Sequence, residues 1–290
     1  MLKKNGFVKS HGLGNDYVVL DASQLSFPIN KSTVQRICDV HFGLGSDGIL
    51  LYEGETNGLF RLRIFNLDGS EAEKSGNGLR IFAKFLYDYG YVHTPHFRIS
   101  TTGGIVSANI DKQIKGKASL ITIDMGKATF TANEIPVNCQ DTECFGCPLD
   151  IGDTKLTIHC VSVGNPHCVI FTDTLDEQQV RTLGPLIENH PMFPNRINVQ
   201  FVRPISDSEI EMLIWERGAG YTLASGSSSC AAVAVTHKKG LTGKEVVVNM
   251  PGGKLIITLE SDWNIRLCGS VSQIAEGVLS DELTEELNRL

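Results

Sequence analysis

Two stretches of the chain share one order of apolar and polar positions. In each, an apolar run typical of a strand leads into a short polar segment, and an apolar run with helical character follows. The polar segments are residues 73–80 and 222–229, and each contains serine and glycine at the predicted start of the helix. Backbone N–H groups at a helix start have no partner within the helix, and the helix dipole is positive there. Both segments therefore predict a place where a carboxylate can bind.

These stretches are copies within a longer repeat. Landmark residues recur about 150 positions apart: Asn15 and Asn165, Asn66 and Glu216, Ser75 and Ser225, Gly103 and Gly253. Such a period is too long for a solenoid and indicates a duplicated domain.

The first half predicts a mixture of strands and two helices. Apolar and β-branched runs predict strands at residues 17–20, 49–52, 61–65, 97–99 and 105–108. A helix is expected over residues 32–40 with Ser32 as its N-cap, and a largely buried helix is expected from Leu79. The pair Gly103-Gly104 is expected to turn a hairpin.

The second half repeats this order. Strands are expected at residues 156–163, 169–171, 198–202, 210–215, 245–249 and 254–259. A helix over residues 175–183 should end at Gly184-Pro185, and a second helix over residues 230–235 is apolar all round and should be buried. Leucines at helical spacing predict a last helix after Ser280.

The expected fold class is therefore α+β, with two pseudo-symmetric domains. Each domain should be a mixed or antiparallel sheet wrapped around a central buried helix. A length of 290 residues suits two cores better than one. We predict domains over residues 1–118 and 119–271, with residues 272–290 returning to the first domain. Two such halves facing each other would present both helix N-termini to one small anionic substrate.

Composition narrows the class of protein. A formal net charge of −7 disfavours a nucleic-acid-binding surface, and no apolar run is long enough to span a bilayer. The basic start, residues 1–6, has no apolar segment behind it, so we do not expect a secretory signal. We expect a cytoplasmic location instead. The eight cysteines should then be mostly free thiols.

Three of these cysteines are close together in the sequence: Cys139, Cys144 and Cys147. A zinc site normally shows paired C-x-x-C units or a clear histidine partner. We expect no metal here and interpret the cluster as part of a loop, although zinc stays open as the alternative.

Seven motifs resemble the diaminopimelate epimerase family, in the family's order and over nearly the whole chain. They are KSHGLGND (9–16), FGLGSDG (42–48), FNLDGSE (65–71), GNGLR (76–80), GNPH (164–167), RINV (196–199) and WERGAG (215–220). The resemblance implies an amino-acid epimerase that uses no cofactor, here called cofactor-independent. It acts on a small amino-acid substrate, and a homodimer is the default expectation for its assembly.

By resemblance, the site combines side chains and helix-start amides from both halves. The groups implied to bind substrate are Asn15, Asn66, Asn165, Asn198, Glu216 and Arg217, together with the backbone amides of Gly76, Asn77, Gly226 and Ser227. His167 and Glu216 are implied to support the reacting carbon.

The departure from the family is at the two catalytic positions. The family uses two cysteines, one on each face of the α-carbon, and here both are serine, Ser75 and Ser225. A thiol ionises at about pH 8.5, and a hydroxyl whose pKa is about five units higher costs about 7 kcal/mol more to ionise. That is roughly 10⁵ in rate unless a neighbour takes the proton. His167 and Glu216 are the candidates for that neighbour.

Nearby positions depart as well. Tyr221 stands where the family usually has glutamate, and Ser227, Ser228 and Ser229 replace a Thr-Gly-Ala type of segment. We interpret the chain as a natural divergent member in which Ser75, Ser225, His167 and Glu216 are the catalytic residues. Two alternatives stay open: a related isomerase or lyase on another amino acid using Ser, His or Glu, and a non-catalytic amino-acid-binding homologue. The distal group of the substrate is not fixed by the sequence.

Overall fold

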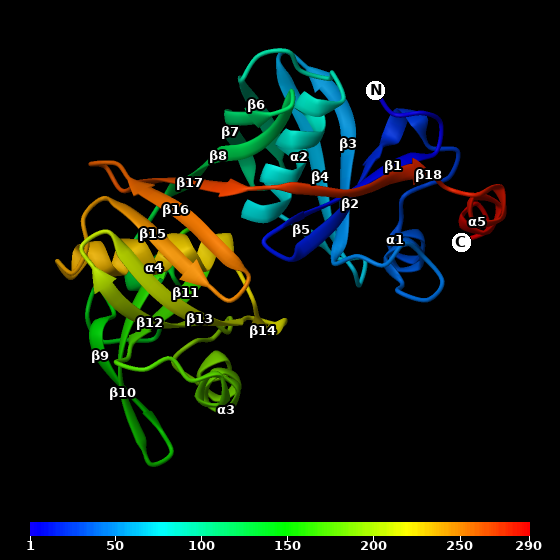
Figure 1. The fold of residues 1–290 in the computed structure, drawn as a ribbon. Helices are drawn as coiled ribbons and strands as arrows, with labels where there is room; N and C mark the ends of the chain where they lie inside the picture. Colours follow the sequence, from blue (N-terminus) through cyan, green and yellow to red (C-terminus); the bar gives the residue numbers. More distant parts are fainter. The chain divides into compact units, whose positions relative to one another are not determined.

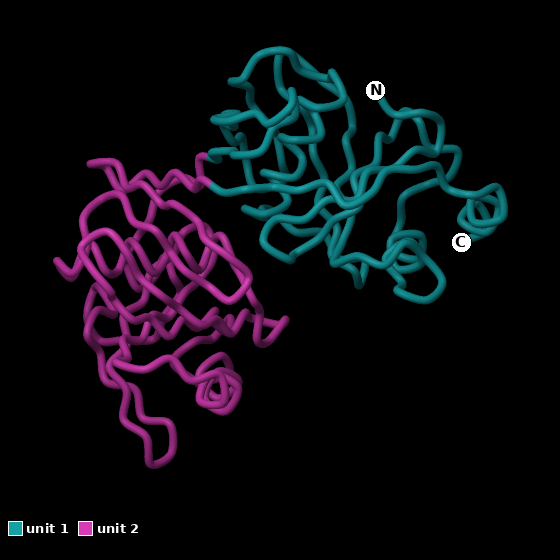
Figure 2. Tube along the Cα trace, in the orientation of Figure 1, with its two compact units in different colours: residues 1–123, 269–290 teal, residues 124–268 magenta.

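The computed structural model describes all 290 residues, which form two compact units. Unit 1 comprises residues 1–123 and 269–290, and unit 2 comprises residues 124–268 (Figure 2). Strands β8 (Lys117–Lys127) and β17 (Asn264–Ser270) contain the two boundaries. None of the helices combines the length and the apolar character needed to cross a membrane.

Unit 1 is a sheet-rich body with three helices (Figure 1). Its strands are β1 (Gly6–Gly12), β2 (Asn15–Asp21), β3 (Gly48–Thr56), β4 (Leu59–Asn66), β5 (Glu71–Ala72), β6 (His96–Thr101), β7 (Gly104–Ile114) and β18 (Ser272–Val278), and its helices are α1 (Lys31–Cys38), α2 (Gly76–Asp88) and α5 (Asp281–Leu287). Leu287 of α5 is buried in one cluster with Val34 and Ile37 of α1. The C-terminal segment therefore packs within this unit.

Unit 2 is likewise built mainly of strands, with two α-helices. Its strands are β9 (Phe145–Ile151), β10 (Thr154–Ser162), β11 (Pro166–Phe171), β12 (Asn198–Ser206), β13 (Glu209–Glu216), β14 (Gly220–Thr222), β15 (Glu245–Met250) and β16 (Gly253–Leu259), and its helices are α3 (Glu177–Glu188) and α4 (Gly226–Lys238).

The repeat seen in the sequence is present in the strand register. Strands β12 and β13 and helix α4 begin and end 150 residues after β3, β4 and α2. Phe65 pairs with Glu71 as Trp215 pairs with Tyr221. After the helices the offset falls to 149, because the hairpin residue that matches Gly253 is Gly104. The pairing of Gly103 with Gly253 was therefore wrong by one residue.

Each unit is built around one buried helix, which confirms the predicted α+β fold class. Residues 76–86 of α2 are all buried, and α4 buries most of its residues up to Thr236. Helix α4 contacts β10, β11, β12, β15 and β16, and α2 contacts β1, β2 and β7. Short side chains such as Ala231, Ala232 and Ala234 let the surrounding strands approach α4 closely.

Two helix boundaries differ from the prediction. Helix α1 begins after Asn30, whose side chain accepts the Thr33 N–H while the Thr33 hydroxyl accepts the Asn30 N–H, so Asn30 and not Ser32 is the N-cap. Helix α3 continues through Gly184 and Pro185 to Glu188. A Cβ at Gly184 would lie 2.5 Å from the Trp215 ring, so this glycine serves close packing and does not end the helix.

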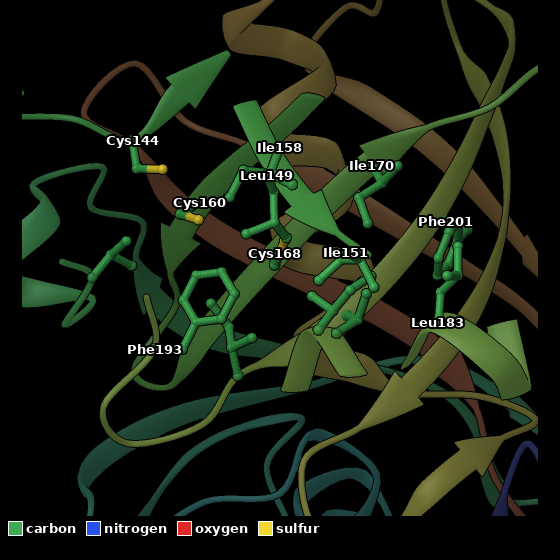
Figure 3. Packing of buried hydrophobic residues seen from close by; sticks show 14 of the residues in the cluster. Cys144, Leu149, Ile151, Ile158, Cys160, Cys168, Ile170, Leu183, Phe193 and Phe201 are labelled. Carbon is green, nitrogen blue, oxygen red and sulfur yellow. The ribbon is translucent and has the colours of Figure 1, made fainter. Parts of the chain in front are cut away.

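One apolar core cluster of unit 2 contains three of the cysteines. Cys144, Cys160 and Cys168 are fully buried among Leu149, Ile158 and other apolar side chains (Figure 3). All eight cysteines of the chain are free thiols. No group of three or more His, Cys, Asp or Glu side chains is arranged to hold a metal ion.

Candidate active site

Ser75 is the N-cap of helix α2. Its backbone is extended, and its hydroxyl oxygen accepts the N–H of Gly78 at 3.1 Å. A Cβ at Gly78 would lie 3.3 Å from Ser75 Oγ and 3.0 Å from Leu50 Cδ2, so glycine is the residue that leaves room for the cap. The side chain of Ser75 is only partly buried. The helix N-terminus thus presents a hydroxyl beside the free N–H groups of its first turn.

A chain of hydrogen bonds orients Asn15 and Asn77 in unit 1. The guanidinium of the fully buried Arg80 donates to Asn77 Oδ1 at 2.8 Å and to the Gly76 carbonyl at 3.0 Å. Asn77 Nδ2 donates to Asn15 Oδ1 at 3.2 Å, and Asn15 Nδ2 donates to Asp47 Oδ2 at 2.8 Å. Along this chain each asparagine has its amide oxygen on the side of the Arg80 guanidinium and its amide nitrogen on the side of the Asp47 carboxylate.

Asn66 lies at the end of β4, beside this chain. Its Nδ2 donates to Ser70 Oγ at 2.9 Å, and the next residue, Leu67, donates its N–H to the Asp47 carbonyl. The five predicted residues of unit 1 (Asn15, Asn66, Ser75, Gly76 and Asn77) therefore all lie on neighbouring turns joined through Asp47 or through α2.

Ser225 occupies the matching place in unit 2 with different partners. It is the N-cap of α4, is only 4% exposed, and accepts the Ser228 N–H at 3.4 Å. The Glu216 side chain is half-buried, and its pKa responds to the Ser225 hydroxyl nearby. Burial raises the pKa of Glu216, while the hydroxyls of Ser225 and Thr222 partly offset that rise. Ser225 is therefore a hydroxyl near a carboxylate whose pKa is raised, which makes that carboxylate a better base than usual.

His167 is completely buried and bonded at both ring nitrogens. Its Nε2 lies 2.9 Å from Asn165 Oδ1, and its Nδ1 lies 3.0 Å from Gln200 Nε2. Since an amide N–H donates, these contacts assign the proton of the neutral ring to Nε2. Burial lowers the pKa of His167 to about 3. The ring therefore remains neutral near pH 7 and orients Asn165, whose Nδ2 points to Ser227 Oγ at 3.5 Å.

Asn198 and Arg217 join two loops of unit 2. Asn198 Nδ2 donates to the Pro166 carbonyl at 2.8 Å, and Asn198 Oδ1 accepts the Arg217 N–H at 3.0 Å. The Arg217 guanidinium donates to the Asn195 carbonyl at 3.0 Å. The predicted residues of unit 2 (Asn165, His167, Asn198, Glu216, Arg217, Ser225, Gly226 and Ser227) therefore form one connected set.

Several supporting residues were not predicted individually. They are Arg80, Asp47, Gln200, Ser228 and Glu188. Arg80, one of two basic residues in a largely apolar helical run, is the sequence feature that could have indicated the first of them. Gln200 is fully buried and donates to both His167 and Ser228 Oγ, the latter at 3.0 Å. The sequence alone does not indicate the contact between Gln200 and Ser228, because it joins residues on β12 and α4.

The two halves differ in the acid–base groups beside the serine. At the repeat spacing, Glu216 of unit 2 corresponds to Asn66 of unit 1, and His167 corresponds to Tyr17. An amide cannot accept a proton as a carboxylate can. The carboxylate near Ser225 therefore has no counterpart at the matching position of unit 1, where the residue is an amide.

Solved structures with a similar fold include a racemase and an epimerase. A probable proline racemase from Agrobacterium radiobacter with bound carbonate superposes with a TM-score of 0.71 at 14% identity, covering 95% of this chain and 93% of that one. A hydroxyproline epimerase from Agrobacterium vitis superposes with a TM-score of 0.69 at 13% identity, covering 96% and 92%. At such identities the likeness defines the fold class alone.

The sequence comparisons are more specific. The family model for diaminopimelate epimerase matches residues 7–131 and 159–273. "Diaminopimelate epimerase 2" of Nostoc sp. is 46% identical over 278 residues, which are 96% of this chain and 96% of the relative. The diaminopimelate epimerase of Methanothermobacter thermautotrophicus is 43% identical, over 88% of this chain and 91% of the relative. The chain belongs to the diaminopimelate epimerase family.

Proposed function

We propose that the protein is a cofactor-independent amino-acid epimerase that inverts an α-carbon by proton transfer, with Ser75 and Ser225 on opposite faces of that carbon. The observation that carries the proposal is the half-buried Glu216 carboxyl near Ser225, whose pKa is raised by burial and partly lowered again by the Ser225 hydroxyl. Family membership supports the reaction class, since the relatives are named as epimerases. Diaminopimelate, the substrate in those names, is the first substrate to test.

The substrate carboxylate would be held by the helix starts. In the proposed complex, the free N–H groups of Gly76 and Asn77 and of Gly226 and Ser227 donate to the carboxylate of the substrate. Both helices carry a positive partial charge at that end, which also favours the negative charge that develops as the α-proton leaves. Arg217 and the oriented amides of Asn15, Asn66, Asn165 and Asn198 supply the remaining polar contacts.

The proton steps use the difference between the two halves. Ser225 Oγ removes the α-proton while its own proton passes to Glu216, so no free alkoxide forms on that side. Ser75 donates its proton to the opposite face and is reprotonated by water, to which its partly exposed side chain is open. Glu216 then returns its proton to solvent, which restores the starting state.

The coupling to Glu216 addresses the main energetic difficulty of the proposal. An unassisted serine base would cost about 7 kcal/mol more than a thiolate, roughly 10⁵ in rate. General-base assistance by a positioned side chain typically recovers about 10²–10⁴ of such a loss. We therefore expect a slower enzyme than a cysteine-containing relative. His167 serves in this proposal as a positioning residue for Asn165, because its lowered pKa makes the ring a poor proton acceptor.

The second candidate is an amino-acid-binding protein without turnover. It is favoured by one observation: each serine oxygen already accepts a helix N–H, which is the ordinary role of an N-cap. The tyrosine at position 221 also suggests a changed pocket, because the Arg181 guanidinium stacks on its ring at 4.4 Å.

Deuterium exchange separates the two candidates. The protein is incubated in heavy water with L,L-diaminopimelate, its meso isomer, and other L- and D-amino acids, and the α-proton is followed by NMR. Incorporation of deuterium with inversion supports the epimerase. Binding of an amino acid without any incorporation supports the second candidate, and exchange without inversion indicates an isomerase or lyase that works on one face.

A further inference from the structure

Glu188, the last residue of helix α3, places a buried carboxylate beside the segment that carries Glu216 and Arg217. Its side chain is 6% exposed. Glu188 Oε1 accepts the Gly218 N–H at 2.9 Å and the Arg196 guanidinium at 3.0 Å, and Oε2 accepts the indole N–H of Trp215 at 2.7 Å. One carboxylate therefore binds three donors: one from strand β13, one from the turn after it, and one from the loop before β12.

This position is unfavourable for an acid unless its partners are present. The carboxyl end of a helix carries a negative partial charge, which repels a carboxylate, and burial disfavours the charged form further. Three hydrogen bonds, one of them from a guanidinium, offset both effects.

The donors lie on both sides of the two candidate substrate-binding residues. Trp215 precedes Glu216, and Gly218 follows Arg217. The Trp215 ring is fixed further by close approach of the backbone, since a Cβ at Gly184 would lie 2.5 Å from the ring and a Cβ at Gly220 would lie 3.5 Å from it. Holding both flanks leaves the intervening segment little freedom.

Unit 1 has no such network at the matching positions of the repeat. At the 150-residue spacing, the positions of Glu188, Arg196 and Trp215 are occupied by Cys38, Ser46 and Phe65. Ser46 Oγ donates to Cys38 Sγ at 3.4 Å, and Phe65 packs in the apolar core of unit 1. The carboxylate network is therefore confined to the half that contains Glu216 and Arg217.

We propose that Glu188 is a positioning residue, which holds residues 215–218 so that Glu216 and Arg217 face the substrate. It touches neither the substrate nor the reacting carbon. The inference rests on the proposed function for its kinetic consequence, but its structural part concerns Trp215 and can be measured without any activity.

The test uses Trp215 as a reporter. The chain has two tryptophans, so a Trp263→Phe background leaves Trp215 as the only one. Glu188→Gln, which keeps the shape and removes the charge, is compared with Glu177→Gln, which removes an exposed carboxylate from the same helix. We measure acrylamide quenching of Trp215, the KM and kcat for α-proton exchange, and the thermal midpoint.

Glu188→Gln should increase quenching of Trp215 and raise KM by about tenfold or more, the effect of losing one well-fixed binding contact. The value of kcat should change much less, and Glu177→Gln should change neither quantity. Unchanged quenching and unchanged KM in folded Glu188→Gln would overturn the inference. Absence of exchange by the wild-type protein would overturn the proposed function alone, since the quenching result stands independently of it.

Trp215→Phe covers the case in which Glu188→Gln does not fold. It removes one donor to Glu188 and introduces the residue found at the matching position of unit 1. The inference predicts a raised KM for this variant with a smaller change in kcat. Equal KM values for Trp215→Phe and the wild-type protein would contradict it.

Discussion

Ser225 lies near the Glu216 carboxyl, whose pKa is raised by burial and partly lowered again by the Ser225 hydroxyl. Ser75, its counterpart in the repeat, lies in a half where the matching residue is Asn66. A carboxylate can receive the hydroxyl proton and an amide cannot. This difference between two otherwise similar halves is the basis of the predictions that concern activity.

Glu216→Gln should lower α-proton exchange by about 10²–10³, since it removes the proton acceptor of Ser225. In the wild-type protein, exchange should fall as the pH drops through the raised pKa of Glu216, because the protonated acid no longer accepts a proton. The variant should lack this decline. Glu209→Gln, at the other end of strand β13, is the matched control. A pH profile of Glu216→Gln that matches the wild-type profile would contradict the assignment.

The same shift predicts an opposite effect on stability. A carboxyl group whose pKa is higher in the folded state stabilises the protein only while it is protonated, and this contribution is lost as the pH rises through that pKa. Glu216→Gln should therefore increase the free energy of unfolding at pH 7 relative to the wild-type protein. That difference should disappear below the ordinary glutamate pKa of 4.5. Urea unfolding at several pH values measures it.

His167 predicts a loss of stability in acid. Its pKa is lowered to about 3 in the folded protein, against 6.5 for a free side chain. Between these values the unfolded chain binds a proton that the folded chain does not, so stability falls as the pH drops below 6.5. From pH 7 to pH 5 this contributes about 2 kcal/mol.

The measurement compares urea unfolding of wild type, His167→Gln and His41→Gln at pH 7 and pH 5. The His167 variant should lose about 2 kcal/mol less than wild type over this interval, and the exposed His41 variant should behave like wild type. His159 is also buried with its pKa lowered to about 4, so part of the acid sensitivity should remain in every variant. Equal losses in wild type and His167→Gln would show that the ring is not held neutral.

Arg80→Lys should disturb the amide chain of unit 1. Lysine retains the charge but cannot reproduce the fixed fork that reaches both Asn77 Oδ1 and the Gly76 carbonyl. We expect unit 1 to lose about 2 kcal/mol of stability and a carboxylate ligand to bind about tenfold more weakly. Arg98→Lys, an exposed arginine in the same unit, should leave both quantities unchanged. Unaltered ligand affinity in Arg80→Lys would contradict an orienting role.

The ion pair at the end of α2 offers a test of stability alone. Lys84 Nζ lies 2.8 Å from Asp88 Oδ2 with both side chains nearly buried, and Asp88 Oδ1 accepts the Ala118 N–H at 2.8 Å. Asp88→Asn leaves a buried lysine without its counter-ion and should cost about 3–5 kcal/mol. Glu177→Gln breaks the exposed pair with Arg181, which has the same sequence spacing, and should cost less than about 0.5 kcal/mol. Similar losses in the two variants would contradict this difference.

Local patterns predicted much of the fold. The spacing of 150 residues between Ser75 and Ser225 fixed the repeat, and the strands around it follow from apolar alternation. Strand β1 was missed because Lys9, Ser10 and His11 interrupt its apolar pattern, and β18 was missed because nearly all of its residues are exposed. Gly184-Pro185 misled the prediction of α3, since its glycine is required by Trp215, which is distant in the sequence.

The candidate site was likewise predicted only in part from local sequence patterns. Ser75, Ser225 and the asparagines were identified from motifs, because each lies at a turn or a helix start with its own local pattern. The groups that orient them were not, because Gln200 meets His167 and Glu188 meets Trp215 only through the fold. The proposed site residues leave local patterns in the sequence, whereas the residues that orient them depend on contacts between distant segments.

Replacing both serines by cysteine tests the account most directly. Ser75→Cys with Ser225→Cys supplies thiols that ionise near pH 8.5, so exchange of the α-proton of diaminopimelate in heavy water should accelerate by about 10–10³-fold over wild type. Ser32→Cys, in the first turn of α1, should leave the rate unchanged. A folded double variant that binds diaminopimelate yet exchanges no faster than wild type would contradict the claim that these two side chains act at the α-carbon.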